Sequence, residues 1–215
     1  MSIAVEQLIP AIVGYVNEHN GYVTKTKLLK LLYLFDVEFF RTNRRTFTGF
    51  QWKFFHLGPW TPEYEPLVHN LVANGVLIEQ RSFRSEYDTT FFRSTEHHDF
   101  SKLFSSFADE ATLRRVLNTW AENSTGEILD YVYFRTEPME HGIRNELLDF
   151  AHIPEEVAAK YVRSSSGSTK KDIRRLKEKL ANRLRSIEAS KTFEFTPPKY
   201  DDQFQAEMDR LEKQN

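Results

Sequence analysis

The stretch formed by residues 25–41 most strongly limits how this chain can fold. It contains no Gly or Pro and is too long for an ordinary strand, so it predicts an α-helix. On such a helix the polar side chains gather in one narrow stripe, made of Lys27, Lys30, Glu38 and Arg41. Nearly all the remaining surface is Leu, Val, Tyr or Phe. Because a helix that is apolar over most of its circumference has to be covered by other elements, we expect it at the centre of the fold.

Asp36 interrupts the apolar surface of this helix, since it falls almost opposite the polar stripe. A carboxylate there needs an ion pair or several hydrogen bonds, because an unpaired polar group in a dry site is costly. Two interpretations are open: a structural anchor for a nearby loop, or a catalytic or metal-binding carboxylate. We favour the anchor because no second carboxylate is evident beside it. We expect it to accept backbone N–H groups from the turn at residues 56–61.

Composition excludes several classes of protein. The 215 residues suffice for one domain with a sizeable core, with or without an extension. The formal net charge of −2 gives no overall positive field toward nucleic acid or acidic membrane. The absence of cysteine rules out disulfides and thiolate metal ligands. With no apolar run near the roughly 20 residues of a membrane span and no secretory signal, we expect a cytoplasmic protein without membrane contact.

The elements predicted along the chain are mostly helical. Apolar residues at helical spacing predict further helices over residues 3–17, 62–74, 99–108, 110–121 and 126–134. Residues 76–82 and 87–94 predict two antiparallel strands. The expected fold is therefore mainly α with a small antiparallel β-hairpin or sheet (α+β), a compact helical domain around the Leu-rich helix. Helix, helix, helix, hairpin is also the element order of a winged helix.

A tight turn follows the aromatic extended segment at residues 50–56. Gly58 frees the backbone and Pro59 fixes it, so both are expected to be structural, and Thr61 can cap the next helix. Trp60, which lies on this turn, is either a core residue or an exposed anchor for a partner. Both interpretations of Trp60 remain open.

The clearest domain boundary is the Ser-rich run at residues 164–169, which has the composition of a flexible linker. We expect a globular domain over residues 1–163 and a helical extension over residues 170–215.

A basic helix is expected directly after this linker, over residues 170–185. Its narrow apolar seam is flanked by Lys and Arg, so it either docks on the domain or meets a partner helix. Arg174 and Arg175 are candidate partner contacts. If nucleic acid binds at all, this helix is the expected contact.

Motifs of the common enzyme classes are missing. The sequence has no Gly-rich phosphate loop, no GxSxG, no HExxH and no thiol nucleophile. Asp36 with Gln51 and Lys53 is similar to the Asp…(Asp/Glu)-x-Lys pattern of metal-dependent nucleases, but Gln occupies the second acidic position. The His-His-Asp run that ends at Asp99 precedes a predicted helix, which favours Asp99 as a cap over a metal site. We expect no enzyme activity, no metal and no cofactor.

Several motifs, in this order, resemble one known family. The chain contains KLLKLLYLFD, then WKFFHLGPWTPEYEPLVHNLVANGVL, then a Ser-capped helix and a Thr-Glu-Pro turn at residues 136–138. Over residues 3–143 this combination resembles the Panacea domain of SocA-like antitoxins. Met139 departs from the Trp that the family tends to have. The resemblance implies an antitoxin of a prokaryotic or phage toxin–antitoxin system, which neutralises a separately encoded toxin protein by direct binding.

The residues expected to contact that toxin lie around the Gly-Pro turn: His56, Trp60 and Tyr64. The alternative is a nucleic-acid-binding transcriptional regulator of winged-helix type. Its recognition helix would span residues 62–74, which offer two carboxylates and no Lys or Arg. Since phosphate contacts dominate DNA affinity, this composition argues against the alternative. The sequence favours no particular oligomeric state.

Overall fold

The computed structural model describes residues 3–82, 89–95, 99–155 and 201–206. All of these residues belong to one compact unit, and a second unit, Ala158–Lys199, lies wholly outside them. The predicted linker at residues 164–169 and the basic helix with Arg174 and Arg175 therefore lie outside the described residues. They stay predictions.

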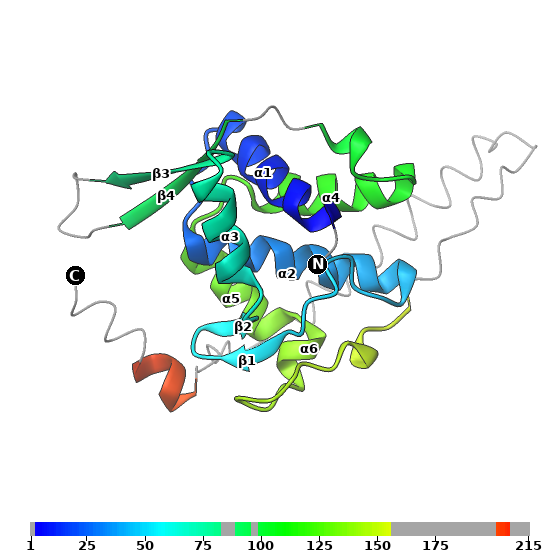
Figure 1. Ribbon diagram of the computed structural model, residues 1–215. Coiled ribbons are helices and arrows are strands. Elements are labelled where there is room, and N and C mark those ends of the chain that lie inside the picture. The colour runs from blue at the N-terminus through cyan, green and yellow to red at the C-terminus, as the bar shows by residue number, and fades with distance from the viewer. Residues whose placement is uncertain (1–2, 83–88, 96–98, 156–200, 207–215) are drawn as a thin grey trace, which may run out of the picture. The chain divides into compact units, whose positions relative to one another are not determined.

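The fold is mostly helical and carries two small antiparallel sheets (Figure 1). Its labelled helices, in chain order within the described ranges, are α1 (Ile3–Glu18), α2 (Lys25–Asn43), α3 (Tyr64–Ala73), α4 (Phe107–Trp120), α5 (Thr125–Arg135) and α6 (Glu137–Glu140), with 3-10 turns η1 (Phe100–Lys102) and η2 (Phe150–His152). Residues 202–206 are also helical. Strands β1 (Lys53–Phe55) and β2 (Gly58–Trp60) form one sheet, and β3 (Leu77–Ser82) and β4 (Thr89–Ser94) the other. The predicted fold class is confirmed, whereas the β1–β2 sheet was not predicted.

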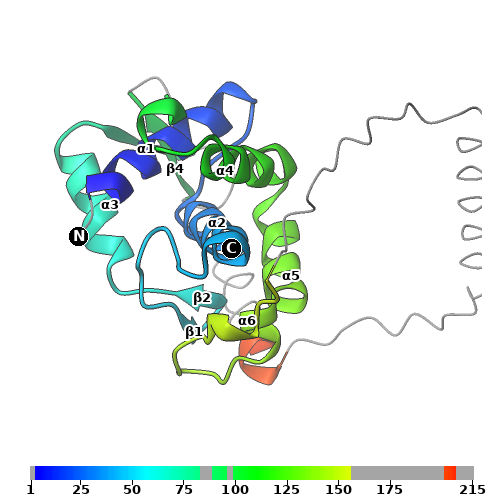
Figure 2. The same ribbon diagram turned by 90° about the vertical axis from the view of Figure 1, so that its right-hand side faces the viewer.

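Helix α2 lies at the centre of the fold, as its sequence predicts. Figure 2 looks nearly along its axis and shows it ringed by α1, α4, α5 and the β1–β2 hairpin. Thr24 caps its first turn, the hydroxyl accepting the N–H of Lys27 at 3.1 Å. Its aromatic side chains pack edge-on into the core, Phe35 against Phe39 at 5.7 Å between ring centroids.

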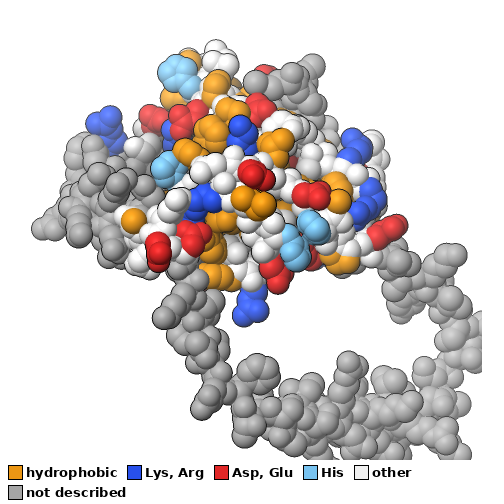
Figure 3. Space-filling view, turned by 90° about the horizontal axis from the view of Figure 1, so that it is seen from below, with side chains coloured by type: hydrophobic (Ala, Val, Ile, Leu, Met, Phe, Trp, Pro, Cys, Tyr) orange, Lys and Arg blue, Asp and Glu red, His pale blue; other side chains and the backbone are white. Residues whose placement is uncertain are grey.

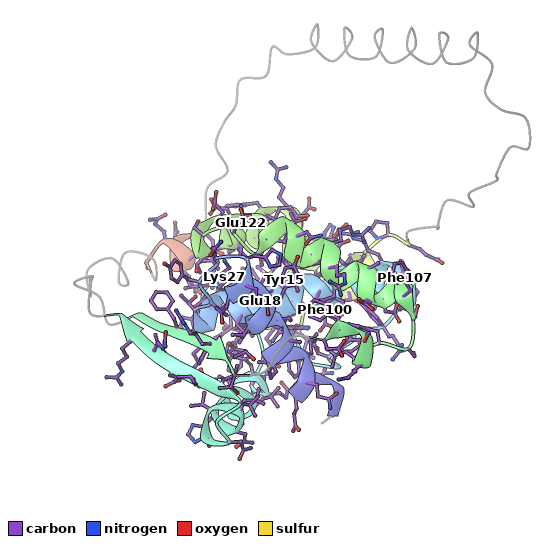
Figure 4. All side chains as sticks on the ribbon, turned by 90° about the horizontal axis from the view of Figure 1, so that it is seen from above. Tyr15, Glu18, Lys27, Phe100, Phe107 and Glu122 are labelled. Carbon is purple, nitrogen blue, oxygen red and sulfur yellow. The ribbon has the colours of Figure 1, made fainter. Side chains whose placement is uncertain are left out.

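The polar stripe of α2 does not face solvent. Lys27 is buried, and its Nζ donates to the carbonyl oxygens of Ala121 and Asn123, both at 2.7 Å. Figure 4 shows Lys27 near Glu122, at the end of α4. At the other end of the stripe, the guanidinium of Arg41 donates to both carboxylate oxygens of Glu137, at 2.7 and 2.8 Å. The stripe therefore ties α2 to α4 and α6.

The β3–β4 hairpin follows α3 and completes the predicted winged-helix order. Its strands pair in register from Leu77 opposite Ser94 to Ser82 opposite Thr89. The amide of Phe92 on β4 donates to the carbonyl oxygen of Val23 at 2.8 Å, so the hairpin also joins the segment that links α1 and α2. Along the chain, the β1–β2 hairpin lies between α2 and α3.

One predicted helix was too long, and one predicted cap was wrong. The predicted helix at residues 99–108 begins with the 3-10 turn η1, which Asp99 caps as predicted by accepting the N–H of Ser101 at 3.2 Å. It does not continue as one helix, because Ser106 starts α4 at Phe107 by accepting the N–H of Ala108 at 3.2 Å. Thr61 caps no helix. Its hydroxyl donates to the Glu63 carboxylate, and α3 begins only at Tyr64.

In the part of the chain that the structure describes, no helix has the length and apolar character needed to cross a membrane.

Asp36 is fully buried and accepts four hydrogen bonds. One carboxylate oxygen accepts the backbone N–H groups of Phe47 and Thr48, at 2.8 and 3.0 Å. The other accepts the Thr48 hydroxyl and the indole N–H of Trp52, the latter at 2.8 Å. The loop that it holds is therefore the one entering β1, and the prediction that it holds residues 56–61 was wrong. Helical phase fixes where a side chain points, but not which of two nearby turns lies there.

Burial and hydrogen bonding shift the pKa of the Asp36 carboxylate in opposite directions. Burial raises the pKa of Asp36 to about 6, against the lowering effect of its bonds from Thr48, Trp52 and Phe47. The group is thus mainly ionised at pH 7, with its charge distributed over four donors. All four donors would be left without this acceptor if the side chain were removed.

We expect Asp36→Ala to lower the free energy of unfolding by about 2–5 kcal/mol, because buried donors are left unsatisfied. Asp36→Asn keeps one oxygen for the two backbone N–H groups and should cost less than Ala. Urea denaturation of the wild type and both variants measures the free energy of unfolding of each, which we expect to decrease from wild type to Asp36→Asn to Asp36→Ala. Glu122→Ala, which removes an exposed carboxylate, is the matched control and should be nearly neutral. A neutral Asp36→Ala would contradict the anchoring role.

Candidate partner-binding surface

The β1–β2 hairpin is extended by a third segment from far along the chain. The amide of Phe54 donates to the carbonyl oxygen of Glu146 at 3.0 Å, and the amide of Leu148 donates to that of Trp52 at 2.8 Å. Lys53 pairs with Trp60 on one side and forms an isolated bridge with Leu147 on the other. Residues 145–148 therefore add a short edge to the sheet.

One face of this small sheet is turned outward. In a sheet, the side chains of directly opposed residues project to the same face, and along one strand every second side chain does so. This face therefore carries Trp60, Lys53, Leu147 and Phe55. We call these four residues the outer face. Leu147 is 55 % exposed and Phe55 37 %, while Trp60 is half-buried. Figure 3, which views the molecule from below, shows hydrophobic side chains interspersed with acidic, basic and histidine side chains.

The opposite face of the sheet is buried against the domain. Phe54 and Pro59, which are paired in register, and Leu148 on the third segment are all buried. The ring of Phe54 packs edge-on against that of Tyr133 on α5, with centroids 5.6 Å apart. Among the described residues, the sheet therefore has one side packed on the domain and one side that is partly exposed.

A buried lysine of α2 forms a hydrogen bond with the hairpin. The Nζ of Lys30 donates to the carbonyl oxygen of Pro59 at 2.7 Å. Gly58 has a φ of 103°, in the left-handed region that favours glycine, which agrees with its predicted structural role. His56 also has a positive φ, 38°, in the two-residue loop that joins the strands.

The residues predicted to bind a partner have different environments. Trp60 is half-buried on the outer face, with its ring centroid 5.3 Å from that of Phe55. His56 is exposed at the tip of the loop. Tyr64 is only 1 % exposed, and its hydroxyl donates to the carbonyl oxygen of Lys25 at 2.8 Å. Tyr64 is therefore a core residue that ties α3 to the start of α2, and it is not part of the outer face.

The sequence reasoning did not assign three residues of the outer face, Lys53, Phe55 and Leu147, or the buried Lys30 that contacts the hairpin. Lys30 was assigned only to the polar stripe, since the sequence does not show that its amine meets the hairpin. Phe55 alternates with Lys53 in the aromatic strand, a pattern that could have assigned both to one face. Leu147 had no such signal, because its segment is too short to show a strand period.

The face that a winged-helix protein would present to DNA is acidic here. The hollow between α3 and β3 is lined by Glu65 and Glu79 together with Lys25 and His69. Lys25 is already paired with Glu65, at 2.8 Å. Since DNA affinity is dominated by contacts to phosphate, this composition disfavours binding there. Among the described residues, no three His, Asp or Glu side chains gather in a way that could hold a metal ion.

Comparison with known proteins gives the class of this chain. Its residues 28–137 match the family model of SocA-like antitoxins, which describes the Panacea domain. The match covers half of the chain and runs from α2 to the start of α6, so the chain belongs to this family. No curated protein and no solved structure matches the chain.

The region that matches the family model includes only part of the outer face. Lys30, Lys53, Phe55 and Trp60 lie within it, whereas Leu147 and the rest of the third segment lie beyond it. The hairpin thus lies within the matched region, and the third segment lies outside it.

We expect the stability of the protein to rise with pH through the titration of Lys30. Burial lowers the pKa of Lys30 from 10.5 to about 7. Between these values the unfolded chain holds a proton that the folded chain has released, so the free energy of unfolding increases with pH, by up to about 1.4 kcal/mol per unit. The stability lost as pH falls from 10.5 to about 7 is the cost of charging the buried amine in the folded protein.

Urea denaturation from pH 7 to 9.5 tests this on wild type, Lys30→Met and Lys102→Met. The rise should become clearly smaller in Lys30→Met, where Lys27, whose pKa burial also lowers, still contributes, and it should persist in full in Lys102→Met, which removes an exposed lysine. The upper limit avoids Tyr33 and Tyr64, whose pKa values are raised by burial and which act above pH 10. Parallel curves for all three proteins would mean that Lys30 does not titrate in this range.

Proposed function

We propose that this protein is the antitoxin of a toxin–antitoxin pair and that it neutralises the toxin, a separate protein, by direct binding. The observation that carries the proposal is the match of residues 28–137 to the SocA-like antitoxin family. Binding rather than catalysis is the proposed mode of action. This agrees with the absence of enzyme motifs from the sequence.

We assign the toxin contact to the outer face. It combines a half-buried Trp, an exposed Leu and an exposed Phe with one Lys, a mixture that suits the apolar centre of a protein–protein interface. The support beneath it is rigid, because Lys30 fixes Pro59 and the buried side of the sheet packs on α5. A surface that is already ordered loses less conformational entropy when a partner binds.

Trp60 is the proposed anchor of this contact. Large aromatic side chains near the centre of an interface contribute the most to affinity, and truncation of such a residue weakens binding about tenfold or more. Trp60 meets this description because Phe55 lies beside it and Lys53 is directly opposite.

The test begins with the gene next to the one for this chain. Its expression alone should arrest growth, and co-expression of this chain should restore growth through a complex that copurifies. We expect Trp60→Ala to weaken the purified complex about tenfold or more and to reduce the rescue of growth, with Leu147→Ser acting in the same direction. Isothermal titration calorimetry gives the affinities, and circular dichroism checks the fold.

Phe107→Ala is the matched control for these variants. Phe107 is 83 % exposed at the N-terminal end of α4 (Figure 4), and α4 and the β1–β2 hairpin lie on opposite sides of α2 (Figure 1). It should leave both affinity and rescue unchanged. If Trp60→Ala is folded and binds with full affinity, the outer face is not the toxin contact. If the neighbouring gene product is harmless and DNA is bound instead, the antitoxin proposal fails in favour of the regulator.

A further inference from the structure

A short segment near the end of the chain is docked on the domain. Residues 202–206 are helical and lie on the β1 and α6 side of the molecule (Figures 1 and 2). Phe204 is only 1 % exposed, and its ring centroid lies 4.7 Å from that of Tyr133, with the planes at 62°. A segment of this length has no core of its own, so the burial of Phe204 comes from the domain.

Asp201 shapes this segment and also pairs it with the domain. Its Oδ1 accepts the backbone N–H of Phe204 at 2.9 Å, so the carboxylate caps the turn that presents the ring. The Nη2 of Arg144 donates to both carboxylate oxygens, at 2.6 and 2.7 Å, and the hydroxyl of Tyr133 donates to Oδ2. One carboxylate thus fixes both the conformation of the segment and its position.

The side chains that receive the segment are held by further contacts within the domain. The guanidinium of Arg144 lies over the ring of Phe54, 4.6 Å from its centroid, and its Nη1 donates to the carbonyl oxygen of His56 at 2.9 Å. Tyr133 packs edge-on against the same Phe54 ring. Three residues from β1, α5 and the loop after α6 therefore form one prearranged set.

The charges of this set are complementary to the segment. Partial burial alone would raise the pKa of Asp201, but the hydrogen bonds from Arg144, Tyr133 and the Phe204 amide lower it to about 2. Burial, together with the Asp201 carboxylate, raises the pKa of Tyr133 to about 12, so its hydroxyl stays a donor at neutral pH. Asp202, the next carboxylate along the chain, is exposed.

We propose that Phe54, Tyr133 and Arg144 form a binding site for a short acidic–aromatic peptide of the pattern Asp-x-x-Phe, and that the chain fills this site with its own residues 201–206. The site recognises two groups at a fixed spacing: the carboxylate by a charge-assisted pair and the ring by an aromatic contact. A segment of the same chain occupies it at a high effective concentration. Arg144 and the occupant both lie beyond the matched antitoxin region, and the inference does not depend on a toxin.

The test uses the full chain with its own segment disabled. A fluorescently labelled peptide with the sequence of residues 198–208 is titrated into wild type and into Phe204→Ala, and anisotropy reports binding. The peptide should bind Phe204→Ala at least tenfold more tightly than wild type, because the internal occupant no longer competes. Adding Arg144→Gln to Phe204→Ala should abolish that binding, with near-ultraviolet circular dichroism as the check of folding.

Two altered peptides provide the matched control. The peptide with Asp201→Asn should bind Phe204→Ala about tenfold more weakly, because it loses the charge-assisted pair. The peptide with Asp202→Asn has the same charge and composition as the peptide with Asp201→Asn, but it should bind as tightly as the unaltered peptide. Equal binding of the two altered peptides would overturn the proposal, since the attraction would then be unspecific.

Hydrogen exchange provides a second measurement that needs no receptor variant. In the full chain the amide of Phe204 should be protected, and Asp201→Asn should remove this protection while Asp202→Asn keeps it. No protection in the wild type, or no peptide binding to a folded Phe204→Ala, would contradict the site. Protection that increases with protein concentration would assign the occupant to a second copy and overturn the internal assignment.

Discussion

The buried carboxylate of Asp36 and the buried amine of Lys30, both on α2, fix the segment from which the outer face is built. Asp36 accepts the donors of the loop at Phe47 and Thr48, and Lys30 donates to the carbonyl oxygen of Pro59. The chain between these two contacts contains all of β1. Because each group is expensive to bury without its partner, the loop and the hairpin have little freedom to move away from α2. Burial shifts the pKa values of both groups toward neutrality, to about 6 and about 7.

This arrangement joins the architecture of the domain to its proposed function. The hairpin packs one side on α5 and leaves the other side partly exposed among the described residues, and residues 145–148, which lie outside the matched region, extend it. Arg144 bonds the carbonyl oxygen of His56 and also pairs with Asp201, so the hairpin loop and the docked segment share one side chain. A toxin that contacts the outer face would thus bind next to a site which the chain itself occupies.

Periodicity and capping in the sequence predicted most helices and the β3–β4 hairpin, but they could not predict which distant residues come into contact. The central position of α2 followed from its apolar circumference, and Asp99 caps the turn η1 as expected. The partner of Asp36 was assigned to the wrong turn, because a helical wheel gives a direction and no distance. The β1–β2 sheet was missed since three-residue strands show little alternation and the Gly-Pro pair indicated only a turn. Of the proposed site, Trp60 was anticipated, while Leu147 and the docking of Phe204 depend on contacts that join distant parts of the chain.

The central claim is that the toxin binds the partly exposed side of the hairpin that α2 supports. Hydrogen–deuterium exchange of this protein, alone and in the complex with the toxin, tests it most directly. The account predicts slower exchange in the complex at residues 53–60 and 145–148, with no change at residues 107–116 in the first turns of α4. Slower exchange confined to α1 and α4, with the hairpin unchanged, would contradict the account.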